Sequence, residues 1–202
     1  MRRSLLAPFL LASLLAVPAS ARAGGIGFLG AAGLHNERVY YYNDSGVQGI
    51  EQQYRPTLGG GIEAVLGDRD DRIQGVARGF YLRDAPQTEP TPEGFSDPVF
   101  DIRDAPMHCG IATVGVVWGL LGDPGAFQVH LVTHLGAGIV TYNGETQEPA
   151  SLEFAIGEAG GGAEYQIARN VEVYLDAVFS GRYRKRFYPG ANGVLGVRVI
   201  FD

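Results

Sequence analysis

The chain has 202 residues, with 16 Lys and Arg against 22 Asp and Glu, which gives a net charge of −6. That length suits one domain, and the acidic balance argues against a nucleic-acid partner held by general electrostatics. Hydrophobic residues make up 46% of the chain, too many for a disordered protein. The 30 Gly are about twice the usual share, which favours paired strands and turns over a helix bundle.

Residues 1–23 are predicted to be a cleaved signal peptide. Arg2 and Arg3 form a basic start, residues 5–17 form an apolar core, and Ala21-Arg22-Ala23 supplies the cleavage pattern. The core is shorter than the roughly 20 apolar residues that a membrane helix needs. We therefore expect residues 24–202 to form one exported domain. Cys109 is the only cysteine and is expected to be a small buried apolar residue.

The rest of the chain alternates with a period of two, which is the period of a β-strand. The pattern is clearest over residues 127–142, where apolar residues such as Leu131 alternate with polar ones such as His130. In residues 73–83 the pattern is ambiguous, because Arg78 shares a face with apolar residues. Eight strands are predicted, over residues 26–34, 54–66, 73–83, 111–121, 127–142, 155–167, 171–183 and 193–201.

The connections between these segments alternate in length. Three are short and rich in turn residues, at Gly67-Asp68-Arg69-Asp70, Gly122-Asp123-Pro124-Gly125 and Arg169-Asn170. Longer polar connections are predicted at residues 35–52, 84–106, 143–150 and 185–192. Short turns at one end and long loops at the other are typical of an outer-membrane barrel with periplasmic termini. The predicted fold class is therefore an all-β, eight-stranded, antiparallel, up-and-down transmembrane β-barrel.

Aromatic residues fall near both ends of the predicted strands. Those near the long loops are Tyr40, Tyr41, Tyr42, Tyr54, Tyr81, Tyr142, Tyr183 and Tyr188. Those near the short turns are Phe28, Trp118, Phe127, Tyr165 and Phe201. Two such bands match the aromatic girdles that lie at the two interfaces of a membrane.

The mature chain resembles the small eight-stranded outer-membrane barrels of the OmpA, OmpX and OmpW kind. The three short turns carry this resemblance, together with the closing strand Gly193-Val194-Leu195-Gly196-Val197-Arg198-Val199-Ile200-Phe201. A terminal strand that ends in an aromatic resembles the signal read by the barrel-assembly machinery, which makes Phe201 the candidate assembly signal. Asp202 follows Phe201, whereas the family pattern ends on the aromatic itself. The resemblance implies an outer-membrane location in contact with lipid and lipopolysaccharide.

The polar face of the strands is predicted to fill the interior of the barrel. An eight-stranded barrel is just wide enough for side chains to fill it, and buried charges must be paired. The predicted lumen network consists of Arg55, Glu63, Arg78, His130, His134, Glu158, Glu164, Glu172, Asp176, Arg182 and Arg198. A structural plug is the main interpretation of this set. A narrow path for ions or small solutes is the alternative.

No metal, cofactor or catalytic site is predicted. The spacing of His130 and His134 would suit zinc on a helix face, but four strand residues span about 13 Å, too far for one shared ion. The serines considered as nucleophiles are Ser45, Ser96, Ser151 and Ser180, and none lies in a hydrolase motif. The protein is therefore predicted not to be an enzyme.

A basic cluster close to the last long connection is a candidate contact for lipopolysaccharide phosphates, because guanidinium groups favour phosphate. It consists of Arg184, Lys185 and Arg186, close to Arg182. The function predicted overall is an integral outer-membrane barrel with a structural or surface-interaction role, its extracellular partner unspecified. The alternative from another class is a soluble, exported, lipocalin-like barrel that buries its apolar face around a ligand.

Overall fold

The computed structural model describes residues 24–42, 45, 48–68, 70–84, 107–124, 126–142 and 150–201. They form eight strands: β1 (Gly24–Tyr42), β2 (Gln48–Leu66), β3 (Ile73–Asp84), β4 (Met107–Asp123), β5 (Phe127–Tyr142), β6 (Ala150–Ala168), β7 (Val171–Arg184) and β8 (Arg186–Phe201). The predicted signal peptide lies outside the described residues. Within the described part of the chain, no helix is long and apolar enough to cross a membrane.

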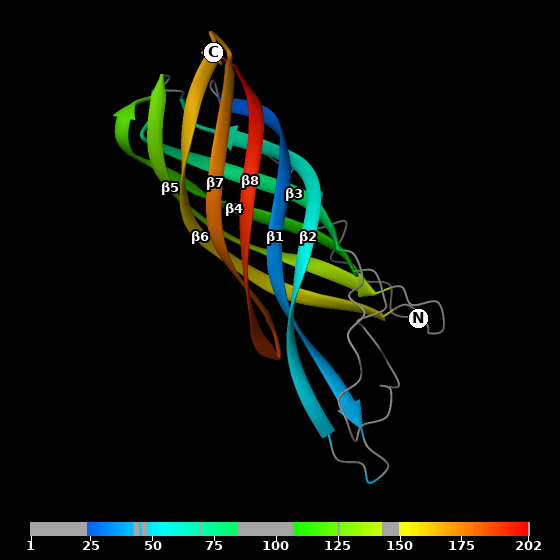
Figure 1. The fold of residues 1–202 in the computed structure, drawn as a ribbon. Helices are drawn as coiled ribbons and strands as arrows, with labels where there is room; N and C mark the ends of the chain where they lie inside the picture. The colour runs from blue at the N-terminus through cyan, green and yellow to red at the C-terminus, as the bar shows by residue number, and fades with distance from the viewer. Residues whose placement is uncertain are drawn as a thin grey trace.

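The eight strands form one closed barrel in which each strand pairs with its neighbours in the chain (Figure 1). All pairings are antiparallel, and β1 closes the barrel by pairing with β8, from Gly24 opposite Phe201 to His35 opposite Gly190. The predicted fold class, an all-β, eight-stranded, antiparallel barrel, is confirmed. Closure leaves no free edge along the wall, which removes the liability that open sheets carry.

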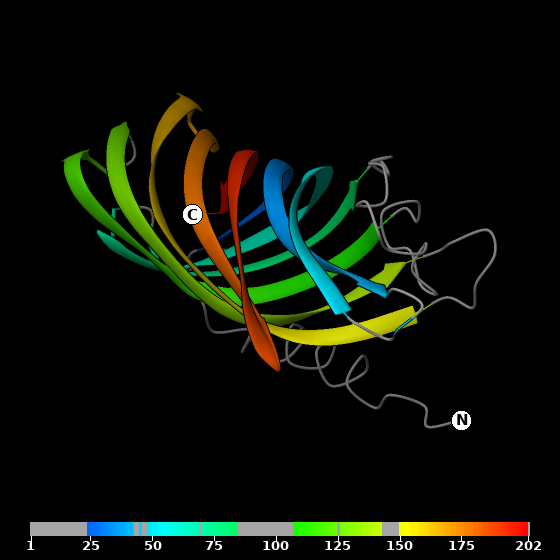
Figure 2. The same ribbon diagram turned by 60° about the horizontal axis from the view of Figure 1, so that its bottom comes forward.

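The two ends of the barrel differ, as Figures 1 and 2 show. The short turns β2–β3, β4–β5 and β6–β7 lie at one end, near the C-terminus, which we call the short-turn end. The β1–β2 and β7–β8 hairpins lie at the opposite end, which we call the hairpin end. The predicted short turns therefore fall at a common end, as the alternation of connection lengths indicated.

Two of the predicted long loops are wrong. Residues 35–52 are mostly strand, because the β1–β2 ladder continues to Tyr42 opposite Gln48. Residues 185–192 are also mostly strand, since Arg184 pairs with Arg186 around Lys185 alone, which adopts a positive φ of 60°. Both segments contain aromatic residues, which favour strands. Most of the other two predicted loops, residues 85–106 and 143–149, lies outside the described residues.

Side chains on the two faces of the wall differ in chemistry. Large apolar side chains face outward on every strand, among them Phe28, Leu58 and Leu135 with 75%, 71% and 71% of their surface exposed. Of the predicted aromatic bands, the following are exposed: Tyr54, Tyr81 and Tyr183 toward the hairpin end, and Phe28, Trp118, Phe127, Tyr165 and Phe201 toward the short-turn end. The prediction that Tyr188 belongs to an outer aromatic band is wrong, because its ring is buried inside the barrel.

The interior is not purely polar. A cluster of buried apolar side chains extends along the barrel from Tyr174 and Leu29 toward the hairpin end: Leu29, Ala31, Phe80, Leu82, Met107, Cys109, Ile111, Val140, Phe154, Ile156, Tyr174 and Val194. This arrangement resolves the ambiguity of β3, where Arg78 and its apolar neighbours Phe80 and Leu82 all point inward. Apolar and charged side chains therefore share the inner wall. Cys109 is buried in this cluster.

Candidate functional site

The residues predicted for the lumen network all point into the barrel and are buried: Arg55, Glu63, Arg78, His130, His134, Glu158, Glu164, Glu172, Asp176, Arg182 and Arg198. Their positions follow from the strand period, because inward positions recur at every second residue. They do not form the single network that the sequence suggested. The structure separates them into groups at different depths along the barrel.

Arg198 is the hub of a group near the short-turn end, which we call the paired network. Its Nε donates to Glu172 Oε2 at 2.7 Å, and its Nη2 donates to Glu164 Oε2. Its Nη1 lies 3.7 Å from Glu63 Oε1. Three carboxylates from β2, β6 and β7 therefore surround one guanidinium from β8, which offsets the cost of burying each charge.

Arg78 is the second cation of the paired network. Its Nε donates to Glu63 Oε2 and its Nη2 to Asp176 Oδ2, each at 2.6 Å. Asp176 also lies 2.7 Å from His130 Nε2. Glu63 contacts both arginines, so it joins the two halves of the network across the barrel.

Tyr174 is the centre of the paired network and was not predicted as a site residue. Its ring contacts both arginines, with the guanidinium carbons of Arg78 and Arg198 at 5.2 and 5.5 Å from the ring centroid. Its hydroxyl donates to Glu63 Oε2 at 3.1 Å. Two cations thus lie within cation–π distance of one ring, a contact that is favourable when desolvated. Tyr174 lies two residues from both Glu172 and Asp176, so the period of the strand places it on the same inward face. This position could have identified it from the sequence.

Inward-facing glycines make room for these bulky side chains. A Cβ at Gly162 would meet His130 Nε2 at 2.8 Å and would also collide with Asp176 Oδ1. A Cβ at Gly196 would fall against the ring of Tyr174, and one at Gly27 would lie 2.9 Å from Arg198 Cβ. The high glycine content of the chain therefore serves the packing of the interior as well as its turns.

Two smaller ionic groups lie farther from the short-turn end. His134 Nδ1 lies 3.3 Å from Glu158 Oε2, and Asn192 donates to Glu158 Oε1 at 3.4 Å. Arg55 Nε lies 2.5 Å from Asp84 Oδ2, and Asp84 Oδ1 accepts the backbone N–H of Met107 at 2.5 Å. Asp84 was missed because it was assigned to a loop. Its parity with Arg78 and Leu82 on β3 would have placed it inside.

Several hydroxyl groups inside the barrel have no hydrogen-bond partner in the described structure. We call Thr57, Thr113 and Ser180 the unpaired residues, since each has a buried side-chain oxygen without such a partner. Ser180 lies four residues beyond Asp176 of the paired network, toward the hairpin end. Ser180 has no exposed surface, which leaves a substrate no access to its hydroxyl.

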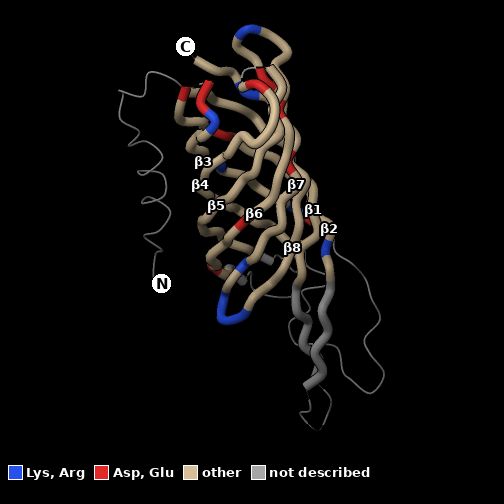
Figure 3. Tube along the Cα trace, turned by 90° about the vertical axis from the view of Figure 1, so that its left-hand side faces the viewer, with Lys and Arg blue, Asp and Glu red and all other residues tan. Residues whose placement is uncertain are grey.

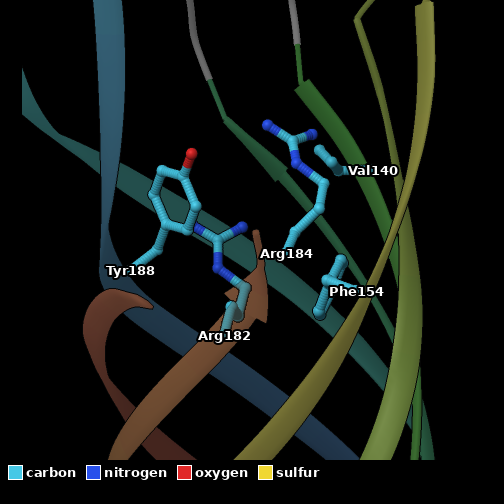
Figure 4. Close-up of a pocket in the computed structure, with 5 residues that line it drawn as sticks. All are labelled: Val140, Phe154, Arg182, Arg184 and Tyr188. Carbon is cyan, nitrogen blue, oxygen red and sulfur yellow. The ribbon is translucent and has the colours of Figure 1, made fainter. Parts of the chain in front are cut away.

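Large side chains lie inside the barrel toward the hairpin end (Figure 4). Val140, Phe154, Arg182, Arg184 and Tyr188 line a cavity of about 10 Å³, which is about the space of one water molecule. Arg182 lies over the ring of Phe154 at 5.6 Å and donates to the carbonyl of Asn36 at 3.2 Å. Arg184 lies over the ring of Tyr188 at 5.7 Å. Arg182 thus belongs to this mouth and not to the paired network.

The predicted basic cluster lies at the tip of the β7–β8 hairpin. Lys185 and Arg186 are exposed there, while Arg184 is partly buried in the mouth. In Figure 3 this tip is coloured blue, and red segments gather at the opposite end together with some blue ones. The acidic residues at the short turns are Asp68, Asp70, Asp71 and Asp123, with Arg72 and Arg169 nearby.

The described residues contain no group of three or more His, Cys, Asp or Glu side chains placed to hold a metal ion. His130 and His134 both point inward from β5, where each faces a different carboxylate. The strand geometry therefore keeps the two imidazoles in separate environments.

No family model matches the sequence, and no curated protein matches it. Solved structures do. The N-terminal β-barrel domain of Pseudomonas aeruginosa OprF shares 15% identity at a TM-score of 0.52, over 89% of this chain and 98% of that domain. Neisserial surface protein A shares 11% sequence identity at a TM-score of 0.53, over 86% of this chain and 96% of that protein. A third structure is that of Ail, the attachment invasion locus protein of Yersinia pestis, in complex with the heparin analogue sucrose octasulfate. Ail shares 13% sequence identity at a TM-score of 0.51, over 89% of this chain and 99% of that protein.

This chain has the fold of the small eight-stranded outer-membrane barrels. The overlap extends over nearly the whole of each neighbour's chain, so the likeness concerns the complete barrel and not one hairpin. At these identities it shows the fold, and the activity must be argued from the residues themselves.

Proposed function

We propose that this chain is an integral outer-membrane barrel with a structural or surface-interaction role, exported by the signal peptide of residues 1–23. The observation that carries this proposal is the outer wall, where large apolar side chains are exposed on every strand. In water such a wall would be a large aggregation-prone patch. In a bilayer it matches the hydrocarbon, with the exposed aromatic residues at the two interfaces.

The distribution of charge argues against the lipocalin-like alternative. A soluble barrel would bury its Leu, Val and Ile face around a ligand and expose its charges. Here the arginines and carboxylates of the strands lie inside, while Leu58, Ile62 and Leu135 face outward. The apolar face therefore points outward and the charged face inward, as a barrel surrounded by lipid requires.

We further propose that the lumen is plugged and that the protein is not an enzyme. The paired network crosses the barrel near one end, and the cavity at the other end has the volume of about one water molecule. Both features support the plug over the narrow pore.

Two measurements test these proposals. On separated membrane fractions, the unboiled protein should be recovered with the outer membrane and shift in gel mobility when boiled. Recovery in the soluble fraction without a shift would contradict the membrane assignment. In planar bilayers the purified protein should show no discrete conductance steps, and reproducible steps would replace the plug with a pore.

The basic cluster supports a contact with lipopolysaccharide phosphates at the hairpin end. Lys185 and Arg186 are exposed at the tip, and the similar barrel Ail was solved with a sulfated saccharide bound. The double variant Arg184→Gln and Arg186→Gln should retain less lipopolysaccharide on purification. Unchanged retention would remove this contact.

Phe201 is proposed as the signal read by the barrel-assembly machinery. It is the last residue of β8, half-exposed on the outer wall, and pairs with Gly24 at the closure. Phe201→Ala should lower the fraction of heat-shifted protein in the outer membrane. Full assembly of this variant would assign the signal elsewhere.

A further inference from the structure

The outer wall carries a groove that the proposed function does not use. It runs across β4 to β8 with a volume of about 560 Å³, within the ~300–1,000 Å³ range of ligand pockets. Gly157, Gly181, Leu135, Phe179 and Phe187 are among the residues that line it. These side chains are apolar and face outward.

The groove exists because neighbouring strands place small residues side by side. Leu135 pairs with Gly157, and Gly157 pairs with Gly181, so two positions in one row lack side chains. A Cβ at Gly157 would meet Leu135 Cδ2 at 3.5 Å and nothing else within 4 Å. The ring of Phe187 already occupies the space above Gly181, where its Cε2 and Cζ would collide with an added Cβ, and it borders the groove.

The groove lies next to the basic tip. Gly181 is three residues from Arg184, a separation of about 10 Å along a strand, whereas the short-turn end of β7 is ten residues away, about 33 Å. Phe187, which borders the groove, directly follows Arg186. An apolar groove and a basic cluster thus share the β7–β8 hairpin, with the apolar part on the membrane side.

We propose that this groove holds one acyl chain of a phosphorylated glycolipid of the outer leaflet, whose phosphate meets Lys185 and Arg186. The inference rests on the proposed function, because it takes the outer wall to face lipid. The groove is continuous with that wall, so it faces the hydrocarbon of the bilayer. The positive tip adds the selectivity, since a phosphate group at the hairpin end complements Lys185 and Arg186.

The test fills the groove without disturbing the backbone. Gly157→Leu places a side chain in the groove, where a Cβ makes only an ordinary contact. Gly79→Leu is the matched control, because Gly79 also faces outward and has nothing within 4 Å of an added Cβ, but it lines no part of the groove. Purified full-length protein in detergent is titrated with bis-phosphorylated lipid A, and the complexes are counted by native mass spectrometry.

Gly157→Leu should lower lipid A binding at least tenfold, while Gly79→Leu binds as the parent does. Equal binding by Gly157→Leu and the parent overturns the groove, provided that both show the same heat-dependent gel shift. Lys185→Gln with Arg186→Gln should also lower binding. If this pair binds lipid A normally while Gly157→Leu does not, the phosphorylated occupant is wrong.

The outcome is separable from the fate of the proposed function. Fractionation decides whether the protein resides in the outer membrane, and lipid titration of the purified protein decides the groove. Deacylated lipid A serves as the second probe. It should bind at least tenfold more weakly than the intact lipid, and equal binding would assign all of the affinity to the basic tip and none to the groove.

Discussion

The paired network and the unpaired residues occupy the same barrel interior, yet they satisfy their polar atoms differently. Near the short-turn end, Arg78 and Arg198 each contact at least two carboxylates. Elsewhere on the inner wall, the hydroxyls of Thr57, Thr113 and Ser180 have no hydrogen-bond partner in the described structure. Leaving a neutral group unpaired costs about 1–3 kcal/mol, while an unpaired buried charge costs several kcal/mol per ion. The fold therefore concentrates its pairing where the charges are.

Removing the hub of the paired network should have the largest effect. Arg198→Met keeps much of the side-chain volume but leaves Glu63, Glu164 and Glu172 facing one another without this cation. We expect a loss of about 3–5 kcal/mol in the free energy of unfolding, measured by urea titration in detergent micelles. A loss below about 1 kcal/mol would show that water and not Arg198 satisfies these carboxylates.

A matched pair of glycines tests whether the interior is packed around the network. Gly162→Ala should cost about 1–3 kcal/mol, because the added Cβ falls on His130 and Asp176. Gly79→Ala on the outer wall should be neutral or stabilising by up to about 1 kcal/mol, since its Cβ meets open space. The same urea titration reports both. Equal effects would mean that the inner wall yields as easily as the outer one.

Tyr174 allows the ring to be separated from the hydroxyl. Tyr174→Leu should cost more than Tyr174→Phe, because only the leucine variant removes the aromatic ring that contacts Arg78 and Arg198. We expect about 1–2 kcal/mol for loss of the hydroxyl and a further loss of about 1–2 kcal/mol for the ring. Urea midpoints of the two variants give the difference. Identical midpoints would assign the whole contribution to the hydrogen bond with Glu63.

The smallest effect is expected among the unpaired residues. Ser180→Ala removes a buried hydroxyl that has no partner in the described structure, so stability should change by less than about 0.5 kcal/mol or increase. Ser180→Val, which adds volume, is the steric control. A loss above 1 kcal/mol for Ser180→Ala would reveal a hydrogen bond, such as one to ordered water, and would weaken the contrast with the paired network.

The strand pattern was enough to predict the barrel, because each face has its own chemistry and a period of two assigns every residue to one face. The same parity placed the predicted lumen residues inside. It could not show which charges meet, since contacts across the barrel depend on register and on depth. Arg55 and Arg182 therefore share a face with Arg198 but lie in separate groups with Asp84 and with Phe154.

Strand ends were harder to predict. The β7–β8 turn has a single residue, Lys185, in a conformation that usually favours glycine, so no turn signature marked it. Asp84 was lost with the loop to which it was assigned. The apolar cluster inside the barrel was hidden as well, because Leu82 and Ile111 look like outer-wall residues until the register with their neighbours is known.

The seam between β1 and β8 joins residues from the two ends of the described chain, Gly24 beside Phe201. Contacts with such sequence separation form slowly, because the intervening chain must first be ordered. Until β8 is in place, β1 and β7 each present a row of free N–H and C=O groups that invites pairing with another chain. The barrel therefore closes only when β8 pairs with both β1 and β7. A chain without β8 would keep two free strand edges that can pair with other chains and aggregate.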